Sequence, residues 1–198
     1  MRRIGITGSI ATGKSTLLAA FAKAGIPTFS ADQAVAELYA GAAVTPVEKL
    51  FPGVAKAGVI DRQDLARRLA ADPSGFKRLE AVVHPLVREA IADFLDHAER
   101  DGAVAAAVEV PLLFESGYDY GFDGVAVTYV DDATQIARIM ARPGMSVEKR
   151  DALLARQMPQ AEKKAKASWA FDTSRPPADI EAEVARLVES FRVEGERR

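Results

Sequence analysis

Residues 8–15 read Gly-Ser-Ile-Ala-Thr-Gly-Lys-Ser, and this stretch fits the phosphate-loop pattern G-x-x-x-x-G-K-[ST]. The residues before it, Arg3–Thr7, read as a short buried strand, and those after it, Thr16–Lys23, read as the first turns of a helix. Glycines allow backbone N–H groups to curl around a triphosphate, and the N-terminus of a helix adds partial positive charge at the same place. The stretch therefore predicts a nucleoside triphosphate site between a strand and a helix.

Two side chains of this loop have a defined chemistry in the pattern. Lys14 is predicted to reach the β- and γ-phosphates and to act in catalysis, and the Ser15 hydroxyl is predicted to be a ligand of Mg²⁺. The alternative is a glycine-rich turn that carries a lysine by chance, and the strand–loop–helix context argues against it. The predicted nucleotide-binding residues are Gly8, Ser9, Ile10, Ala11, Thr12, Gly13, Lys14, Ser15 and Thr16.

The composition narrows the classes of protein to which this chain can belong. Its 198 residues suit one domain with an insertion, and 48% hydrophobic and 27% charged residues are usual for a globular protein. A net charge of −2 gives no general attraction to nucleic acid or to an anionic membrane, and the absence of cysteine excludes disulfides and thiolate chemistry. The most apolar run, Ala103–Phe114, contains Glu109 and is shorter than the roughly 20 residues of a membrane helix. We therefore expect a cytoplasmic enzyme without nucleic-acid or membrane partners. We further expect a monomer or weak homo-oligomer, and the sequence, without a coiled-coil seam, does not fix which.

Short apolar runs alternate with helical patterns along the chain, which favours parallel βαβ units. Because the runs are almost continuously apolar, they suit a sheet that is covered on both faces. We expect an α/β fold of the P-loop NTPase type, with a five-stranded parallel sheet and helices on both faces. A final amphipathic helix is predicted at Asp179–Val193, followed by an irregular tail at 194–198. The predicted strands are Arg3–Thr7, Ile26–Phe29, Ala103–Val110, Val125–Val130 and Trp169–Phe171.

A long segment, residues 34–101, separates the second and third predicted strands and has no strand pattern of its own. It contains two helical patterns, Arg62–Leu69 and Lys77–Val83, and Asp61 and Asp72 stand before them as helix-start signals. The segment is too long for a simple crossover connection. We therefore predict a helical, acceptor-binding insertion at the carboxyl edge of the sheet, where open α/β sheets bind ligands.

The nucleotide-binding core is then predicted to comprise residues 1–33 and 102–198. Within the core, residues 138–166 mix helix-forming residues with many positive charges. Half or more of these charges are expected on a solvated helix face. The functional interpretation of the segment is a mobile lid whose arginines close over the transferring phosphate. The basic side chains are Arg138, Arg142, Lys149, Arg150, Arg156, Lys163, Lys164 and Lys166.

A phosphate loop alone does not distinguish a switch, a motor and a kinase. The chain has no N-K-x-D motif for reading guanine, and a small-molecule kinase needs a base near the acceptor hydroxyl and cations for the developing charge. Asp32 follows the second predicted strand and is the candidate catalytic base. Position alone supports equally well an N-cap of the helix Gln33–Tyr39. Arg138 and Arg142 are the candidate catalytic cations of the lid.

Several stretches resemble those of the dephospho-coenzyme A kinase family, in the same order along nearly the whole chain. Residues 79–88 read Leu-Glu-Ala-Val-Val-His-Pro-Leu-Val-Arg and match L-E-x-I-x-H-P-x-V-R, and residues 111–115 match P-L-L-F-E. The phosphate loop, Ala31-Asp32, residues 58–62, residues 135–138 and Arg156-Gln157 resemble the family as well. The resemblance implies a kinase that uses ATP and Mg²⁺ to phosphorylate the ribose 3′-hydroxyl of dephospho-coenzyme A, the last step of coenzyme A biosynthesis.

The resemblance also implies roles for particular residues. Asp32 becomes the general base or orienting carboxylate, and the acceptor is expected near His84 and Arg88, which share a helix face. Without the resemblance, His84 reads as a core histidine bonded to backbone, and Arg88 as a surface ion pair with Glu89 or Asp93. The implied substrate-binding residues are Thr7, Asp32, His84, Arg88, Pro111, Leu112, Leu113 and Phe114.

The chain departs from the family pattern at three sites, of which Ser30, where an acidic residue often precedes Ala-Asp, matters least. Pro143 stands in the lid where the family usually reads R-D-G, and Thr173 stands where it favours Asn, which leaves the lid geometry and the choice between ATP and GTP open. Glu109 ends the third predicted strand and is either a carboxylate that acts on Mg²⁺ through water or a buried residue bonded to backbone. The rival functions are another small-acceptor kinase, of nucleoside monophosphate or shikimate type, and a non-catalytic nucleotide switch or scaffold.

Overall fold

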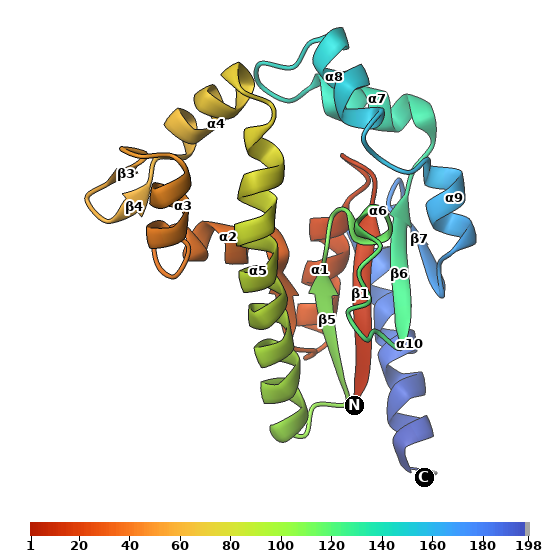
Figure 1. Cartoon of the computed structure of the whole chain (residues 1–198). Coiled ribbons are helices and arrows are strands. Elements are labelled where there is room, and N and C mark those ends of the chain that lie inside the picture. The colour runs from red at the N-terminus through yellow and green to blue at the C-terminus, as the bar shows by residue number, and fades with distance from the viewer. Residues whose placement is uncertain (197–198) are drawn as a thin grey trace. The chain divides into compact units, whose positions relative to one another are not determined.

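The computed structural model describes residues 1–196 and divides the chain into two compact units (Figure 1). The first unit contains Met1–Ser30 and the chain from Leu95 onward, and the second contains Ala31–Phe94. These bounds differ from the predicted boundaries at 33 and 102. Helix α2 (Ala31–Leu38) already begins before Asp32, and the last turns of α5 (Gly75–Arg100) belong to the first unit. No helix among the described residues is both long and apolar enough to cross a membrane.

The first unit is built on a parallel sheet of five strands in the order β2-β5-β1-β6-β7, which confirms the predicted fold class. Strand β1 lies in the middle, so the loop that follows it stands at the centre of the carboxyl edge. The bounds are β1 Arg2–Gly8, β2 Thr28–Ser30, β5 Ala105–Glu109, β6 Gly124–Tyr129 and β7 Trp169–Asp172.

Strand β2 begins two residues later than predicted because the preceding residues close a helix. The Ile26 N–H donates to the carbonyl of Phe21 at 3.1 Å, and Gly25 has a φ of 79°, as in a glycine-terminated helix end. This bond ends α1 (Lys14–Lys23) and orients Ile26 into the core. The apolar side chain of Ile26 therefore belongs to the turn after α1 and not to the strand.

Helices cover both faces of the sheet, as predicted. Alternate residues of β1 point to opposite faces: Arg2 pairs with Glu194 of α10 (Pro177–Glu196), and Arg3 pairs with Glu99 at the end of α5. Ile4 and Ile6 join the core with α1 and α10, including Phe21, Val184 and Phe191. Helix α10 continues to Glu196, so the predicted tail begins too early, and residues 197–198 lie outside the described part of the chain.

The segment between β6 and β7 contains the predicted lid. It folds into three helices, α7 (Asp132–Met140), α8 (Val147–Leu154) and α9 (Gln160–Ala165). A tight turn links α7 and α8, in which the Met145 N–H donates to the carbonyl of Arg142 at 3.2 Å. Pro143 and Gly144, with a φ of 70°, occupy the two central positions of this turn, which suit proline and glycine. Pro143 therefore forms part of a regular turn in the lid.

The second unit is mostly helical, but the expectation that it contains no strand is wrong. A two-stranded antiparallel hairpin joins β3 (Ala55–Lys56) to β4 (Val59–Ile60). Ala57 and Gly58, with φ of 49° and 80°, form its turn, because tight hairpin turns favour positive φ at both central positions. Strands of two residues are too short to show an alternating pattern. The helices of this unit are α2, α3 (Val44–Leu50), α4 (Arg62–Ala71) and most of α5.

Both helix-start signals predicted in the second unit have structural counterparts. Asp61 is the N-cap of α4, and its carboxylate accepts hydrogen bonds from the N–H groups of Gln63 and Asp64. Asp72 instead accepts from the Ser74 N–H, and α5 begins one residue later at Gly75. The helix α5 continues through Pro85, so the predicted pattern at Lys77–Val83 is a part of a much longer helix.

Replacing Gly5 by Ala is expected to destabilise the protein by about 1–3 kcal/mol, because the added methyl group would overpack the space beside β1. A Cβ at Gly5 would lie 2.6 Å from the Phe122 ring and 3.1 Å from Leu113. The matched control is Gly41→Ala, where the nearest neighbour of a Cβ, the Glu37 carbonyl oxygen, lies at 3.6 Å. Urea unfolding of both variants measures the difference, and equal midpoints would contradict this packing argument.

Candidate active site

The phosphate loop connects β1 to α1 and is packed tightly against neighbouring hydroxyl groups. A Cβ at Gly8 would lie 2.2 Å from Thr128 Oγ1, and a Cβ at Gly13 would lie 2.8 Å from Thr173 Oγ1. Gly13 is also the N-cap of α1, with a left-handed φ of 83°. Both glycines are therefore required for the close approach of the loop. The positive φ of 63° at Ala11 has no counterpart in the sequence pattern.

Buried threonines hold the backbone of this loop. The Thr12 hydroxyl donates to the Ser9 carbonyl at 2.8 Å and lies 2.8 Å from Thr128 Oγ1. Thr173 Oγ1 donates to the Thr12 carbonyl at 2.7 Å, and Arg138 donates to the Thr173 carbonyl at 2.9 Å. Thr173, the residue that departs from the family pattern, therefore supports the phosphate loop directly.

Lys14 and Ser15 open helix α1 at the end of the loop. Lys14 Nζ donates to the carbonyls of Gly8 and Ser9 at 3.1 and 3.2 Å, so its ammonium lies over the loop. The first turn of α1 contains no acidic residue that would offset the partial positive charge of the helix end. Ser15 is exposed on this turn. The loop is thus arranged to bind an anion.

The donor set at Ser15 fits a magnesium ion that is shared with phosphate. Mg²⁺ prefers hard oxygen ligands and usually combines one or two protein oxygens with water and substrate phosphates. The Ser15 hydroxyl, exposed beside the anion-binding loop, is a ligand of this kind. Among residues 1–196, no group of three or more His, Cys, Asp or Glu side chains could form a metal site made of protein ligands alone.

Two glutamines from the segment between β6 and β7 contact the phosphate loop, and a third orients one of them. Sequence reasoning did not predict these contacts. Gln157 Oε1 accepts from the Ile10 N–H at 2.8 Å, and Gln135 Nε2 donates to the Ile10 carbonyl at 2.9 Å. Gln160 Nε2 donates to Gln135 Oε1 at 2.8 Å and so orients that amide. The backbone N–H and carbonyl of Ile10 are therefore both bound by side chains of the segment between β6 and β7.

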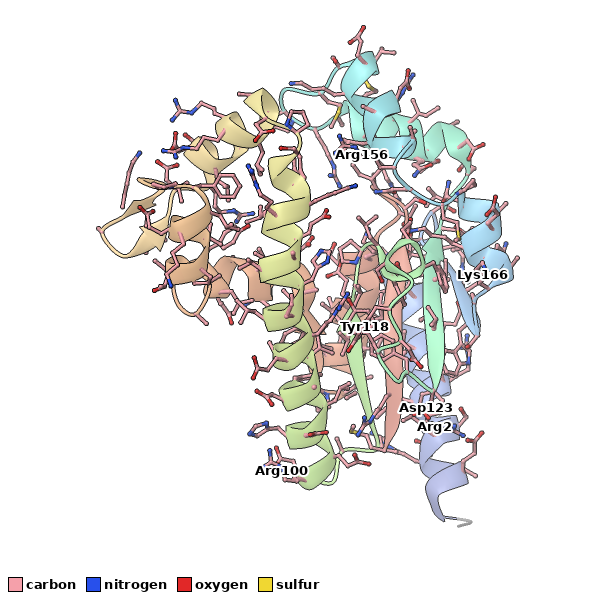
Figure 2. All side chains as sticks on the ribbon, viewed as in Figure 1. Arg2, Arg100, Tyr118, Asp123, Arg156 and Lys166 are labelled. Carbon is pink, nitrogen blue, oxygen red and sulfur yellow. The ribbon has the colours of Figure 1, made fainter. Side chains whose placement is uncertain are left out.

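The lid arginines and Lys163 have different environments. Arg138 is half-buried against Thr173, whereas Arg142 is exposed at the turn after α7. Lys163 is fully buried, and its Nζ lies 2.8 Å from Glu115 Oε1. Lys163 is therefore not one of the charges on a solvated helix face, because its positive charge is paired in the interior. Figure 2 shows Arg156 near α8, beyond the carboxyl edge of the sheet, and Arg2 and Asp123 at the opposite edge.

The predicted acceptor loop, residues 111–114, follows β5 at the carboxyl edge and leads into the short helix α6 (Leu113–Ser116). The Pro111 carbonyl accepts from Thr7 Oγ1 at 3.1 Å. Leu112 is 44% exposed, while Leu113 is 6% exposed and lies near Gly5. Of these side chains, Leu112 and the half-buried Phe114 are accessible to a ligand, and Leu113 packs into the protein.

Glu109 and Ser30 end two neighbouring strands, as register partners of β5 and β2. Ser30 Oγ donates to Glu109 Oε2 at 3.1 Å, and Glu109 is 8% exposed. Glu109 is thus buried, as one alternative predicted, but its carboxylate is bonded to the Ser30 hydroxyl and not to backbone. This contact fixes the carboxylate near the carboxyl ends of both strands.

In the second unit, Asp32 lies in the first turn of α2, and its side chain is exposed. The N-cap alternative is wrong, because the helix begins before Asp32. His84 is exposed on α5, which excludes the core-histidine alternative. It lines a pocket of about 310 Å³ in which cationic side chains gather. The residues of this pocket are Lys77, Glu80, Ala81, His84, Pro85 and Arg88.

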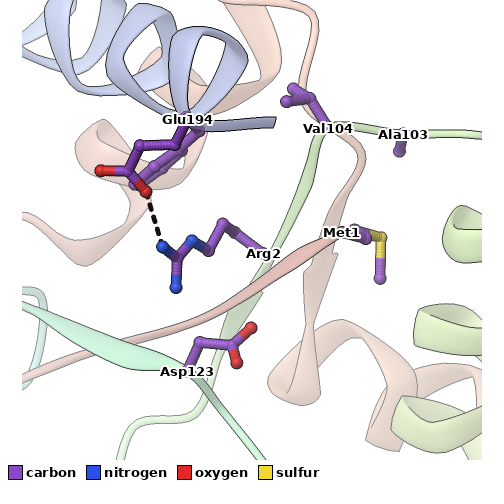
Figure 3. A pocket seen from close by; sticks show the side chains of 7 residues that line it. Met1, Arg2, Ala103, Val104, Asp123 and Glu194 are labelled. Atoms are coloured by element: carbon purple, nitrogen blue, oxygen red, sulfur yellow. Dashed lines mark hydrogen bonds and ion pairs between the residues drawn. The ribbon is translucent and has the colours of Figure 1, made fainter. Parts of the chain in front are cut away.

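A second cavity, of about 360 Å³, lies at the amino edge of the sheet, away from the phosphate loop (Figure 3). Arg2 donates to Glu194 at 2.6 Å across one side of it. None of the predicted site residues lines this cavity. Its lining residues are Met1, Arg2, Ala103, Val104, Asp123, Phe191 and Glu194.

Comparisons with known proteins agree with the geometry of the loop. A family model described as dephospho-CoA kinase matches residues 2–179. A dephospho-CoA kinase of Rhizobium etli is 45% identical over 193 residues, 98% of this chain and 95% of that protein. A crystal structure from Thermus thermophilus has a TM-score of 0.78 at 36% identity and covers 95% of this chain and 97% of its own. A dephospho-CoA kinase structure from Campylobacter jejuni has a TM-score of 0.68 at 27% identity, with coverage of 96% and 97%. The chain belongs to the dephospho-CoA kinase family.

Proposed function

We propose that the phosphate loop binds Mg·ATP and that the chain transfers the γ-phosphoryl group to the ribose 3′-hydroxyl of dephospho-coenzyme A. Membership of the family makes the chain an ATP-dependent kinase of coenzyme A biosynthesis. The observation that carries the site assignment is the loop between the central strand and α1, where Lys14 and the helix N-terminus converge. That arrangement is suited to a triphosphate.

On the nucleotide side, residues 8–16 form the phosphate site, and their backbone N–H groups bind the phosphates, except that of Ile10, which donates to Gln157. Lys14 exchanges the Gly8 and Ser9 carbonyls for oxygens of the β- and γ-phosphates. Mg²⁺ held by Ser15 would supply charge neutralisation on these phosphates. Arg138, which donates to the Thr173 carbonyl, and Arg142 stabilise the negative charge that develops on the γ-phosphoryl group during transfer. These residues lower the barrier by electrostatic stabilisation.

On the acceptor side, Asp32 orients the 3′-hydroxyl and accepts its proton as the hydroxyl oxygen attacks the γ-phosphorus in line. A bond forms from the 3′-oxygen to phosphorus, and the bond from phosphorus to the bridging oxygen of the leaving ADP breaks. His84 and Arg88, together in a cationic pocket, bind the diphosphate of the acceptor. Thr7 and residues 111–114 shape the acceptor site.

The remaining assignments follow from composition and chemistry. A net charge of −2 supports a cytoplasmic enzyme without nucleic-acid or membrane partners. We propose a monomer or weak homo-oligomer. Glu109, fixed by Ser30, is proposed to act on Mg²⁺ through water.

The test is ADP release from purified protein with Mg·ATP, measured alone and with dephospho-coenzyme A, AMP, adenosine or shikimate. We expect strong stimulation by dephospho-coenzyme A alone and one added phosphate in the product by mass spectrometry. Stimulation by a different acceptor would keep the kinase but overturn the substrate. ATP binding without stimulated turnover would favour the switch or scaffold class.

A further inference from the structure

Lys163 and Glu115 form a buried ion pair in the first unit that the transfer mechanism does not use. The Lys163 side chain is fully buried and the Glu115 side chain is 16% exposed, with 2.8 Å between Nζ and Oε1. Burial acts to raise the pKa of Glu115, but the hydrogen bonds from Lys163 and the Met158 N–H outweigh it and hold that pKa below its usual value. The Glu115 carboxylate therefore remains charged at neutral pH.

This pair is a poor device for stability alone. Taking two charges out of water costs several kcal/mol for each ion, and an apolar pair of similar volume is often as stable. Here the compensation is incomplete, since Glu115 Oε2 is buried without a hydrogen-bond partner. The pair is better explained by the segments that it connects.

Three separate segments meet at the pair. Glu115 Oε1 accepts from the Met158 N–H at 2.8 Å, between α8 and α9, and Lys163 lies on α9. Lys163 Nζ also donates to the Pro111 carbonyl at 3.5 Å, and Thr7 Oγ1 donates to the same carbonyl at 3.1 Å. The first residue of the acceptor loop is thus held from β1 and from α9.

The same segment also reaches the nucleotide side. Gln157, the neighbour of Met158 in the chain, accepts from the Ile10 N–H of the phosphate loop at 2.8 Å. Gln157 therefore contacts the phosphate loop, and the next residue, Met158, contacts Glu115, which follows the acceptor loop. Glu115 is thus linked to both loops through residues 157–158.

We propose that Glu115 and Lys163 are positioning residues, which hold the acceptor loop at residues 111–114 in register with the phosphate loop. This inference rests on the proposed function, because it assigns the acceptor to that loop. A small displacement of the acceptor hydroxyl from its in-line position lowers the rate of phosphoryl transfer. ATP binding, in contrast, depends on the phosphate loop itself. The pair should therefore affect the acceptor far more than ATP.

The experiment is steady-state kinetics with Lys163→Met, which keeps the length and apolar volume of the side chain. We expect kcat/KM for dephospho-coenzyme A to fall on the order of 10²-fold, with KM for ATP changed by less than about twofold. Glu115→Gln keeps an acceptor for the Met158 N–H and removes only the charge, so we expect the same pattern. The double variant removes both buried charges and should recover part of the loss, because neither ion remains unpaired.

The matched control is Lys23→Met, which removes the lysine of an ion pair between α1 and Glu181 of α10. That lysine is 69% exposed, and no kinetic change is expected. Unchanged kinetics in Lys163→Met, or equal losses toward ATP and acceptor with a lower melting temperature, would overturn the inference. If Lys163→Met does not fold, Glu115→Gln decides by the same split. A wild-type protein without transfer would instead refute the proposed function together with this inference.

Discussion

Replacing Asp32 by Asn is expected to lower kcat for transfer to dephospho-coenzyme A by about 10²–10⁴-fold and to leave ATP affinity unchanged. The amide can still hydrogen-bond the 3′-hydroxyl but cannot accept its proton as the oxygen attacks. Asp32 is exposed in the first turn of α2, so the substitution should not disturb packing. Acceptor-dependent ADP release measures kcat, and calorimetric titration measures ATP binding.

The control for Asp32 is Glu37→Gln on the same helix. Glu37 is exposed and accepts a hydrogen bond from Gln33, so this variant removes one negative charge from α2 without touching the proposed base. Its kcat should stay near that of the wild type. A kcat of Asp32→Asn close to the wild-type value would show that Asp32 is neither the base nor the orienting carboxylate.

Replacing Lys14 by Met is expected to weaken ATP binding and to lower kcat by about 10²–10³-fold, because one preorganised cation is lost from the phosphates. Unlike Asp32→Asn, the Lys14→Met variant is expected to lose affinity for ATP. Lys14 Nζ contacts the Gly8 and Ser9 carbonyls, so the ammonium is already placed over the loop before ATP enters. Titration with Mg·ATP and turnover with saturating acceptor measure the two losses.

The matched control for Lys14 lies on the same helix. Lys23 occupies the last turn of α1 and pairs with Glu181, far along the helix from the loop. Lys23→Met removes the same charge from α1 and should leave ATP affinity intact. Equal affinities of Lys14→Met and wild type for ATP would remove Lys14 from the phosphate site.

The sheet could be predicted because each of its strands carries a local signal. The runs at β1, β5 and β6 are apolar enough to be buried on both faces, and their observed bounds differ from the predicted ones by only a few residues. The hairpin of β3 and β4 could not, since two residues show no alternation and its turn depends on a positive φ at Ala57. The predicted strand began too early, at Ile26, because a buried apolar side chain is as common in the turn after a helix as in a strand.

The phosphate loop was predictable from its spacing, but its supports were not. Thr173 lies 161 residues from Thr12, and Gln157 lies 147 residues from Ile10, so only the fold brings these partners together. Lys163 looked like one charge among many on a helix. Its burial depends on Glu115 and the Pro111 carbonyl, which come from another segment. Local patterns carry no information about such pairs.

The most direct test of the central claim is the position of the transferred phosphate. The protein is incubated with ATP labelled at the γ-phosphate and with dephospho-coenzyme A, and the purified product is treated with a 3′-specific nucleotidase. We expect label in the acceptor product and its complete release by that enzyme. Label that appears only as inorganic phosphate, or that resists 3′-specific release, would overturn the proposed transfer to the 3′-hydroxyl.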